Sequence, residues 1–315
     1  MYNIVLKTTS DGDENYVRYD MADYIISACS TADLTKEQFE QYDIKYIYFH
    51  YSLDGVMYPD DLGQTISFEE FYKKMEEGAD TATSQINPDE FIEFFTPYLE
   101  EGKDVIHCTL SSGISGVHNS ALIARDELQE RYPDRKIIVI DSLCAATGYG
   151  MLMVEAAKKK AAGASIDELA EWIEEHKNKV AHWLYVSDLK YLVKGGRVSK
   201  TSGFIGNMLN ICPIICVDKE GKLAPQEKIR GKKKAAKRLV EKMVELADGG
   251  VDYSGGCWLS MSASMEDAEY LKKLIKETFP KISDEIIINS IGTVIGSHTG
   301  PGTVVMFFWG KEDRE

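Results

Sequence analysis

The feature that most constrains the fold is a regular alternation of short apolar segments and capped helical segments between residues 23 and 163. Buried strands are predicted at 24–28, 105–110 and 136–140. The last two are each followed by a turn and a helical pattern, and the sequence DSLCAATGYG is predicted to form the second turn. Strands that alternate with helices are typical of a doubly wound parallel sheet, so residues 23–163 are predicted to form an α/β/α domain.

Capping residues locate two of the helix starts in this region. Thr35 and Gln38 have the spacing of a capping box, in which side chain and backbone of the two positions bond reciprocally. Asn87 and Pro88 supply an N-cap and a first-turn proline, and Gly102 is expected to end that helix.

The pattern changes after this first region. Strands are predicted at 183–186, 211–217 and 223–229, and the sequence DKEGK between the last two is typical of a hairpin. Residues 164–315 are therefore predicted to form a second, α+β domain with a mixed sheet and helices. Residues 1–22 are an N-terminal extension, which either adds an edge strand near residues 17–19 or forms a mobile tail.

Composition and charge exclude several classes of function. The chain has 51 acidic and 36 basic residues and a net charge of -15, a field that repels nucleic-acid phosphates and anionic lipid surfaces. No segment approaches the roughly 18 uninterrupted apolar residues of a membrane span, and the first residues lack the apolar region of a signal peptide. We therefore expect a cytoplasmic protein without a nucleic-acid partner or an integral membrane segment.

The six cysteines show no spacing typical of a zinc site. Cys212 and Cys216 form a CxxxC pair, but no histidine or second cysteine pair completes a metal site. The cysteines are expected to be reduced and mostly buried, and no metal or cofactor is predicted. A nucleotide-binding protein is not favoured either, because the chain lacks a GxxxxGK[ST] loop.

Three segments rich in hydroxyl groups are candidate binding sites: TATSQ at 81–85, SSGISG at 111–116 and SHTGPGT at 297–303. The SSGISG loop lies between a predicted strand and a predicted helix, where free N–H groups and the helix dipole favour an anion. Its serines could equally serve only to cap the helix. His298 in the third segment is either a structural residue of a Gly-Pro turn or a functional one.

The order of these and other motifs resembles the DegV family of bacterial fatty acid-binding proteins. The motifs are CSTADL, TSQ, SSGISG, IDSLCAATGYG, LKYLVKGGRVS, LNICPIICVD, EKIRG and GSHTGPGT, and they span the chain except for its N-terminal extension. The chain departs from the usual pattern in several places. Cys29 stands where the family often has aspartate, and Cys212 where it has lysine; the family's TSQPS becomes TSQIN at 83–87, and its SGTY becomes SGVH at 115–118. The two cysteines replace a carboxylate and an ammonium group, so the contacts with the partner and with the ligand are not carried over from the family at these positions.

The resemblance implies an α/β/α domain with a parallel sheet and a two-layer α/β domain with a mixed sheet. It also implies a lipid-binding protein rather than an enzyme, which holds a long-chain fatty acid in a buried tunnel and presents its carboxylate to a separate ATP-dependent fatty acid kinase. By the family motifs, the carboxylate site corresponds to Thr83, Ser84, Ser112, Ser115, Gly116 and His298.

Two basic segments, KGGR and KIRGKKK, stand out on this acidic chain. Such segments are commonly solvated surface, but they could also form a docking surface for the kinase. Arg197 and Arg230 are the candidates for that contact.

A serine hydrolase or acyltransferase is the main alternative. Ser112 or Ser115 would be the nucleophile, and the order of serine, Asp141 and His298 matches that of α/β-hydrolases. However, the loop reads SSGISG, and a G-x-S-x-G elbow is what exposes the nucleophile in that fold.

Overall fold

The computed structural model describes residues 5–8, 14–17, 23–199, 210–282 and 285–315. Within these ranges the chain forms a four-stranded parallel sheet, a six-stranded mixed sheet, a three-stranded antiparallel sheet and a separate pair of strands. The predicted fold class, α/β with one parallel and one mixed sheet, is therefore confirmed.

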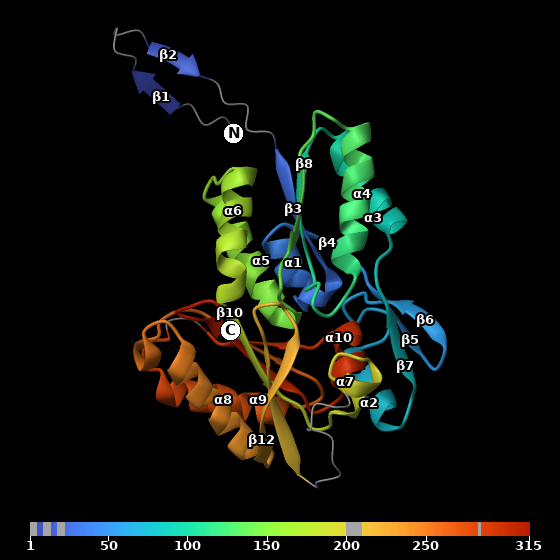
Figure 1. The fold of residues 1–315 in the computed structure, drawn as a ribbon, viewed down its shortest axis with the longest axis vertical. Helices are drawn as coiled ribbons and strands as arrows, with labels where there is room; N and C mark the ends of the chain where they lie inside the picture. The colour runs from blue at the N-terminus through green and yellow to red at the C-terminus, as the bar shows by residue number, and fades with distance from the viewer. Residues whose placement is uncertain (1–4, 9–13, 18–22, 200–209, 283–284) are drawn as a thin grey trace.

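The parallel sheet forms the middle layer of the first half of the molecule. In spatial order its strands are β4 (Ile44–Ile47), β3 (Tyr24–Cys29), β8 (Asp104–Thr109) and β9 (Ile137–Asp141). Helices α3 (Pro88–Glu100) and α4 (Val117–Arg131) lie on one side, and α5 (Ala146–Ala161) and α6 (Ile166–His176) on the other (Figure 1). Every residue of β3 and β8 is buried, because helices cover both faces of the sheet.

The predicted capping interactions are present. Helix α1 (Lys36–Gln41) begins after Thr35, whose side chain accepts a hydrogen bond from the Gln38 N–H while the Gln38 side chain accepts one from the Thr35 N–H. Pro88 is the first residue of α3, and Gly102 follows that helix with a φ of 79°. Local sequence therefore locates these helix ends correctly.

The predicted turn after β9 is too long, because α5 already begins at Ala146. Gly148 and Gly150 resemble turn residues in the sequence, yet both lie inside this helix. A β-carbon on Gly148 would lie 2.4 Å from the Phe307 ring, and one on Gly150 would lie 2.6 Å from the carbonyl oxygen of Ala32. The two glycines let α5 pack closely against its neighbours.

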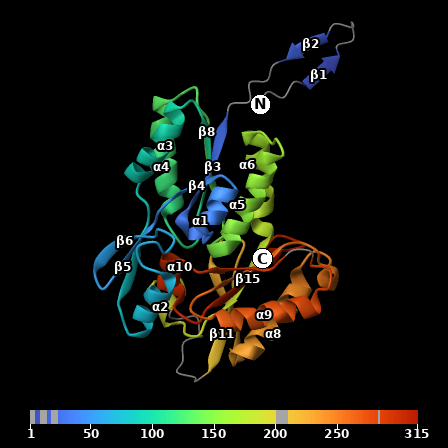
Figure 2. The same cartoon turned by 180° about the vertical axis from the view of Figure 1, so that it is seen from behind.

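The mixed sheet forms the second half of the molecule. In spatial order its strands are β12 (Leu223–Arg230), β11 (Ile211–Val217), β10 (Val180–Tyr185), β15 (Val304–Trp309), β13 (Cys257–Met261) and β14 (Ile287–Ser290). Only β13 and β14 pair in parallel. Helices α8 (Lys232–Leu246) and α9 (Met265–Thr278) cover the outer face (Figure 2), and α5 contacts β10, β13 and β15. The boundary between residues 163 and 164 stays a prediction; α6, which follows it, contacts α5 and β9.

The small antiparallel sheet brings two of the hydroxyl-rich segments together. Its spatial order is β6 (Val56–Pro59), β5 (His50–Leu53) and β7 (Thr81–Ser84), and α2 (Phe68–Glu76) lies between β6 and β7 in the chain. Helix α10 (Thr293–Thr299) contacts β5, β7 and α7 (Lys190–Lys194). The SHTGPGT segment is thus not wholly a turn, because His298 lies in the last turn of α10.

The described part of the N-terminal extension contains β1 (Val5–Thr8) and β2 (Glu14–Val17), which pair with each other in antiparallel fashion. Of the predicted edge strand at residues 17–19, Val17 ends β2, and the other two residues lie outside the described ranges.

All six cysteines are free thiols; Cys216 is half-buried and the other five are buried, as predicted.

Candidate fatty acid site

A cavity of about 380 Å³ lies between the parallel sheet and the mixed sheet. Its position beyond the carboxyl end of β8 is the usual place for a ligand in an open α/β sheet. Most of its lining is apolar: Phe49, Leu110, Ile114, Ala145, Ala146, Leu184, Leu192, Val217, Leu223, Val294, Ile295, Val305 and Phe307. The polar lining residues are Thr83, Ser84, Gln85, Ser115, His182, Arg197, His298 and Thr299.

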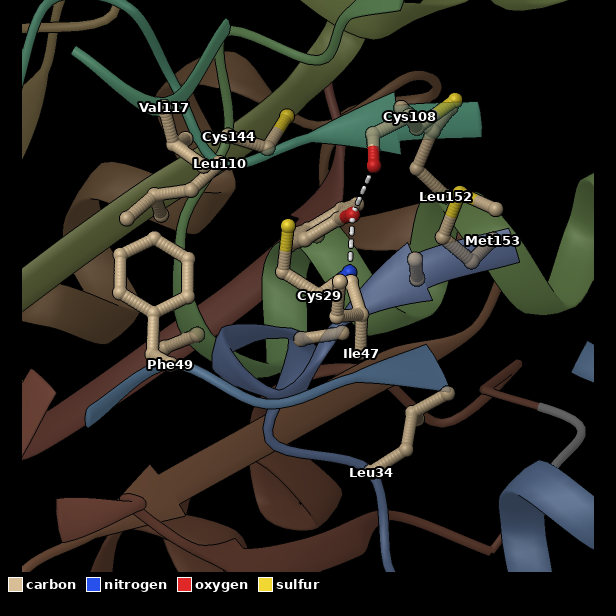
Figure 3. Close-up of a cluster of buried hydrophobic side chains, with 14 of the residues drawn as sticks. Cys29, Leu34, Ile47, Phe49, Cys108, Leu110, Val117, Cys144, Leu152 and Met153 are labelled. Carbon is tan, nitrogen blue, oxygen red and sulfur yellow. Dashed lines mark hydrogen bonds between the residues drawn. The ribbon is translucent and has the colours of Figure 1, made fainter. Parts of the chain in front are cut away.

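Part of the apolar wall continues into the buried core around the parallel sheet. Phe49 and Leu110 line the cavity, and they lie beside Cys29, Cys108 and Val117 in a cluster of buried side chains (Figure 3). Within this cluster the Cys29 N–H donates to the Tyr149 hydroxyl at 3.0 Å, and that hydroxyl donates to the Cys108 carbonyl. The buried tyrosine thus ties β3 to β8 below the cavity.

Thr83 and His298 form the central polar contact of the cavity. Thr83 Oγ1 on β7 lies 2.8 Å from His298 Nε2 on α10. The other ring nitrogen, Nδ1, is buried and has no hydrogen-bond partner in the part of the chain that the structure describes. Burial lowers the pKa of His298 to about 4, and the positive charges of Arg197 and Lys194 add to this effect. The imidazole is therefore neutral near pH 7 and retains unused hydrogen-bonding capacity.

Ser84 and Ser115 also line the cavity, as the predicted site requires. Ser115 Oγ accepts a hydrogen bond from the Val117 N–H at 3.2 Å at the start of α4, so its hydroxyl proton remains available to another acceptor. Ser84 ends β7 and is exposed. Ser84, Ser115, Thr83 and His298 are thus neutral polar groups that line the same cavity.

Ser112 and Gly116, by contrast, do not line the cavity. Ser112 is exposed, and its backbone N–H donates to Asp141 Oδ1 at 3.1 Å. Gly116 lies at the start of α4, where an added β-carbon would be 2.8 Å from the Gln85 amide oxygen. Among the SSGISG serines the structure thus places Ser115, and not Ser112, at the cavity.

The two predicted docking residues occupy different environments. Arg197 is half-buried and lines the cavity; its Nε–H donates to the Ile114 carbonyl at 3.1 Å and a second guanidinium N–H to the Gly195 carbonyl at 2.5 Å. Arg230 is exposed at the end of β12 and does not line the cavity. Arg197 therefore brings a positive charge close to His298, which the sequence did not predict.

His182 was missed as a cavity residue in the sequence, and Gln85 was included in the TATSQ segment without being named as a site residue. His182 lies within a buried strand of apolar residues, where no motif distinguishes it. Its Nδ1–H donates to the Val180 carbonyl at 2.8 Å and its Nε2 accepts from the Ala145 N–H at 3.2 Å. Burial lowers its pKa to about 3, so it is a neutral wall residue with both nitrogens bonded. The Gln85 amide donates to Ser120 Oγ at 3.0 Å.

The arrangement of a serine hydrolase is not assembled around these residues. Asp141 accepts from the backbone N–H groups of Ser112 and Leu143, and His298 bonds Thr83. A nucleophilic serine needs a base within hydrogen-bond reach, and that base is normally oriented by a third group. The described contacts of Ser112 and Ser115 include no imidazole.

Comparison with known proteins establishes the family. The family model described as "Uncharacterised protein, DegV family" matches residues 26–311. The chain belongs to the DegV family. A DegV domain-containing protein of Clostridium perfringens is 38% identical over 290 residues, which cover 92% of this chain and 98% of that protein.

Solved DegV structures share the fold. A DegV lipid binding protein from Thermotoga maritima is 32% identical and superposes with a TM-score of 0.79, over 93% of this chain and all of that one (100%). A second Thermotoga maritima protein, described as revealing a fatty acid binding function, is 31% identical with a TM-score of 0.78, over 91% of this chain and 98% of that one.

The described residues of this DegV chain contain no group of three or more His, Cys, Asp or Glu side chains arranged to hold a metal ion. None of the helices they form has the length and apolar character needed to cross a membrane.

Proposed function

We propose that this protein binds one long-chain fatty acid in the cavity, with its carboxylate at Thr83, Ser115 and His298. The observation that carries the proposal is the Thr83–His298 pair on the wall of an otherwise mainly apolar cavity. The lipid and fatty acid binding attributed to two Thermotoga maritima relatives supports the same assignment.

The apolar lining accounts for the tail of the ligand. Each methylene that moves from water into an apolar wall contributes about 0.8 kcal/mol. A long acyl chain therefore binds tightly even when the head site supplies only neutral hydrogen bonds.

The polar wall accounts for the head. A carboxylate that leaves water needs several directed donors, and hydrogen bonds to a charged group are the strong ones. Ser115 supplies one donor, and the Thr83–His298 pair supplies one more, because their mutual hydrogen bond uses one of the two protons that the pair carries. The guanidinium of Arg197 supplies a nearby positive charge. Ser112 and Gly116 are left out of the proposed head site because they do not line the cavity.

The protein presents this carboxylate to a separate ATP-dependent fatty acid kinase and is not itself an enzyme. Ser84 and Gln85 line the cavity and are exposed to solvent, so the polar wall reaches the molecular surface. The exposed Arg230 is the proposed docking residue. No base lies in hydrogen-bond contact with Ser115 in the described structure, which favours binding over hydrolysis.

Extraction of ligand from protein expressed in bacteria tests the binding function. Native mass spectrometry is expected to show about one fatty acid per chain, because burial of the tail outweighs dilution in water. Protein that stays free of lipid under conditions that preserve lipid complexes would contradict the proposal.

Labelling and phosphorylation experiments separate the kinase-partner function from hydrolysis. Serine-directed phosphonates are expected to leave the protein unlabelled, and acyl phosphate is expected only when the kinase and ATP are added. Arg230→Ala should reduce phosphorylation while fatty acid is retained, whereas the control Lys276→Ala on α9 should change neither. Stoichiometric labelling that Ser115→Ala or Ser112→Ala abolishes would instead establish the hydrolase.

A further inference from the structure

Two buried carboxylates, those of Asp33 and Asp60, face a second cavity that shares no lining residue with the fatty acid site. This cavity has a volume of about 400 Å³ and lies between the first domain and the segment that leads into α10. Asp33 is 5% exposed and Asp60 2% exposed. Carboxylates this deeply buried require neutralisation or several hydrogen bonds.

Contacts from two distant segments hold the backbone of Asp33 in place. It follows the 3₁₀ helix η1 (Ser30–Ala32) with a left-handed φ of 49°. Its N–H donates to the Ser30 carbonyl at 3.0 Å, and its carbonyl accepts from the Asn289 side-chain amide at 3.0 Å. The position of this residue is thus fixed on two sides, although its side chain takes part in neither contact.

The two carboxylates differ sharply in their hydrogen bonds. Asp60 accepts from the Ser30 hydroxyl at 2.8 Å and from the Thr293 hydroxyl at 2.5 Å. Both oxygens of Asp33 are buried, and neither makes a hydrogen bond of good geometry with the residues that the structure describes; the Gly292 N–H faces this carboxylate without completing such a bond. An unpaired buried carboxylate is strongly unfavourable, so Asp33 needs a partner that protein groups do not provide.

Gly292 marks where the two carboxylates converge. It has a φ of -67° and a ψ of 168°, which any residue adopts, so its backbone does not require glycine. A β-carbon at this position would lie 2.6 Å from Asp33 Oδ1 and 3.5 Å from Asp60 Oδ1. Asp33 Oδ1 therefore packs closely against Gly292, and a larger residue at this position would have to displace it.

We propose that Asp33 and Asp60 bind one hydrated divalent cation of the magnesium or calcium type. Cations of this class prefer carboxylate oxygens, and magnesium keeps several waters when one or two carboxylates hold it. The cavity provides room for such waters, each of which occupies about 30 Å³ in the liquid. The sequence predicted no metal because the two acids come from separate segments without the spacing of a known ligand motif.

A proton is the competing occupant of the site. Burial raises the pKa of Asp33 well above its usual range, the charge of Asp60 raises it further, and the N–H of Gly292 partly offsets the increase. Burial also raises the pKa of Asp60. A proton would remove the charge of Asp33, but its O–H would still be a buried donor without an acceptor among the described residues. A cation with bound water satisfies both oxygens.

Calorimetry on full-length protein treated with EDTA tests this directly. Titration with Mg²⁺ alone and with Ca²⁺ alone is expected to give one binding site per chain for at least one of the two ions. Thermal unfolding in the same buffers should show a higher midpoint with that ion. If the wild-type protein binds neither ion at millimolar concentration, the carboxylates are protonated and the proposal is overturned.

Three variants locate the site. Loss of an indirect partner of a metal already costs roughly 10- to 100-fold in affinity, so Asp33→Asn should weaken binding at least that much. Gly292→Ala should also weaken it, because the added methyl group would displace the Asp33 carboxylate. The control Glu269→Gln on α9 should bind like wild type. Unchanged affinity in folded Asp33→Asn or Gly292→Ala protein would overturn the assignment. If neither variant folds, the titration of the wild-type protein tests the proposal by itself.

Discussion

The β-carbon that an alanine at position 195 would add lies 2.0 Å from Nδ1 of His298. Gly195 follows α7 with an ordinary φ of -76°, so the close approach of the imidazole, rather than the backbone conformation, requires glycine there. His298 in turn bonds Thr83 at the cavity. The KGGR segment is thereby linked to the proposed fatty acid site through direct packing.

Gly195→Ala is expected to displace His298 and to weaken fatty acid binding. A hydrogen bond to a charged group contributes about 1.5–3 kcal/mol, so its loss corresponds to roughly a 10- to 100-fold weaker affinity. Binding of a fluorescent fatty acid measures the effect. Gly256→Ala is the matched control, because its β-carbon would meet only Trp258 Nε1 at 3.8 Å. Equal affinity in the two variants would show that the position of His298 does not matter for binding.

Thr83 and His298 are expected to act as one unit. Thr83→Val keeps the shape of the side chain and removes its hydroxyl, and His298→Ala removes the imidazole. Each should reduce fatty acid affinity by roughly tenfold or more, and the double variant should lose less than the two single losses combined, because the residues share one hydrogen bond. The four dissociation constants form a double-mutant cycle. Strictly additive losses would indicate that the two residues contact the ligand independently.

The stability of lipid-free protein is expected to fall in mildly acidic solution. The pKa of His298 is lowered from 6.5 to about 4, so between these values the unfolded chain binds more protons than the folded one. The contribution of the neutral imidazole to the free energy of unfolding is complete above pH 6.5 and is lost as the pH falls toward 4. Thermal unfolding measured from pH 7 to 4 should therefore show a shallower decline in His298→Asn than in wild type. His107 and His182, with pKa values lowered to about 3, act in the same direction and extend the decline further.

Leu184→Phe is expected to shorten the acyl chains that the cavity accepts. Leu184 lies on β10 and lines the cavity, so a larger side chain removes part of the space for the tail. Competition between saturated fatty acids of different length measures the preference. Long chains should lose affinity and short chains should lose little. A uniform loss for all lengths would point instead to disruption of the head site or of the fold.

Local sequence determined those helix ends that are stabilised by interactions between residues a few positions apart. The start of α1 follows from the reciprocal bonds of Thr35 and Gln38, and the start of α3 from Asn87 and Pro88. The alternation of strands and helices predicted the parallel sheet, and the ordered motifs predicted the DegV family, which the comparisons confirm.

Only the tertiary structure decided which of the candidate residues meet. Thr83 and His298 are 215 positions apart and come together because α10 packs on β7. Ser115 and Ser112 are equivalent in the sequence, yet only Ser115 lines the cavity, because Ser112 faces solvent beside Asp141. These outcomes depend on contacts between elements that are far apart in the chain, and a local sequence pattern does not determine such contacts.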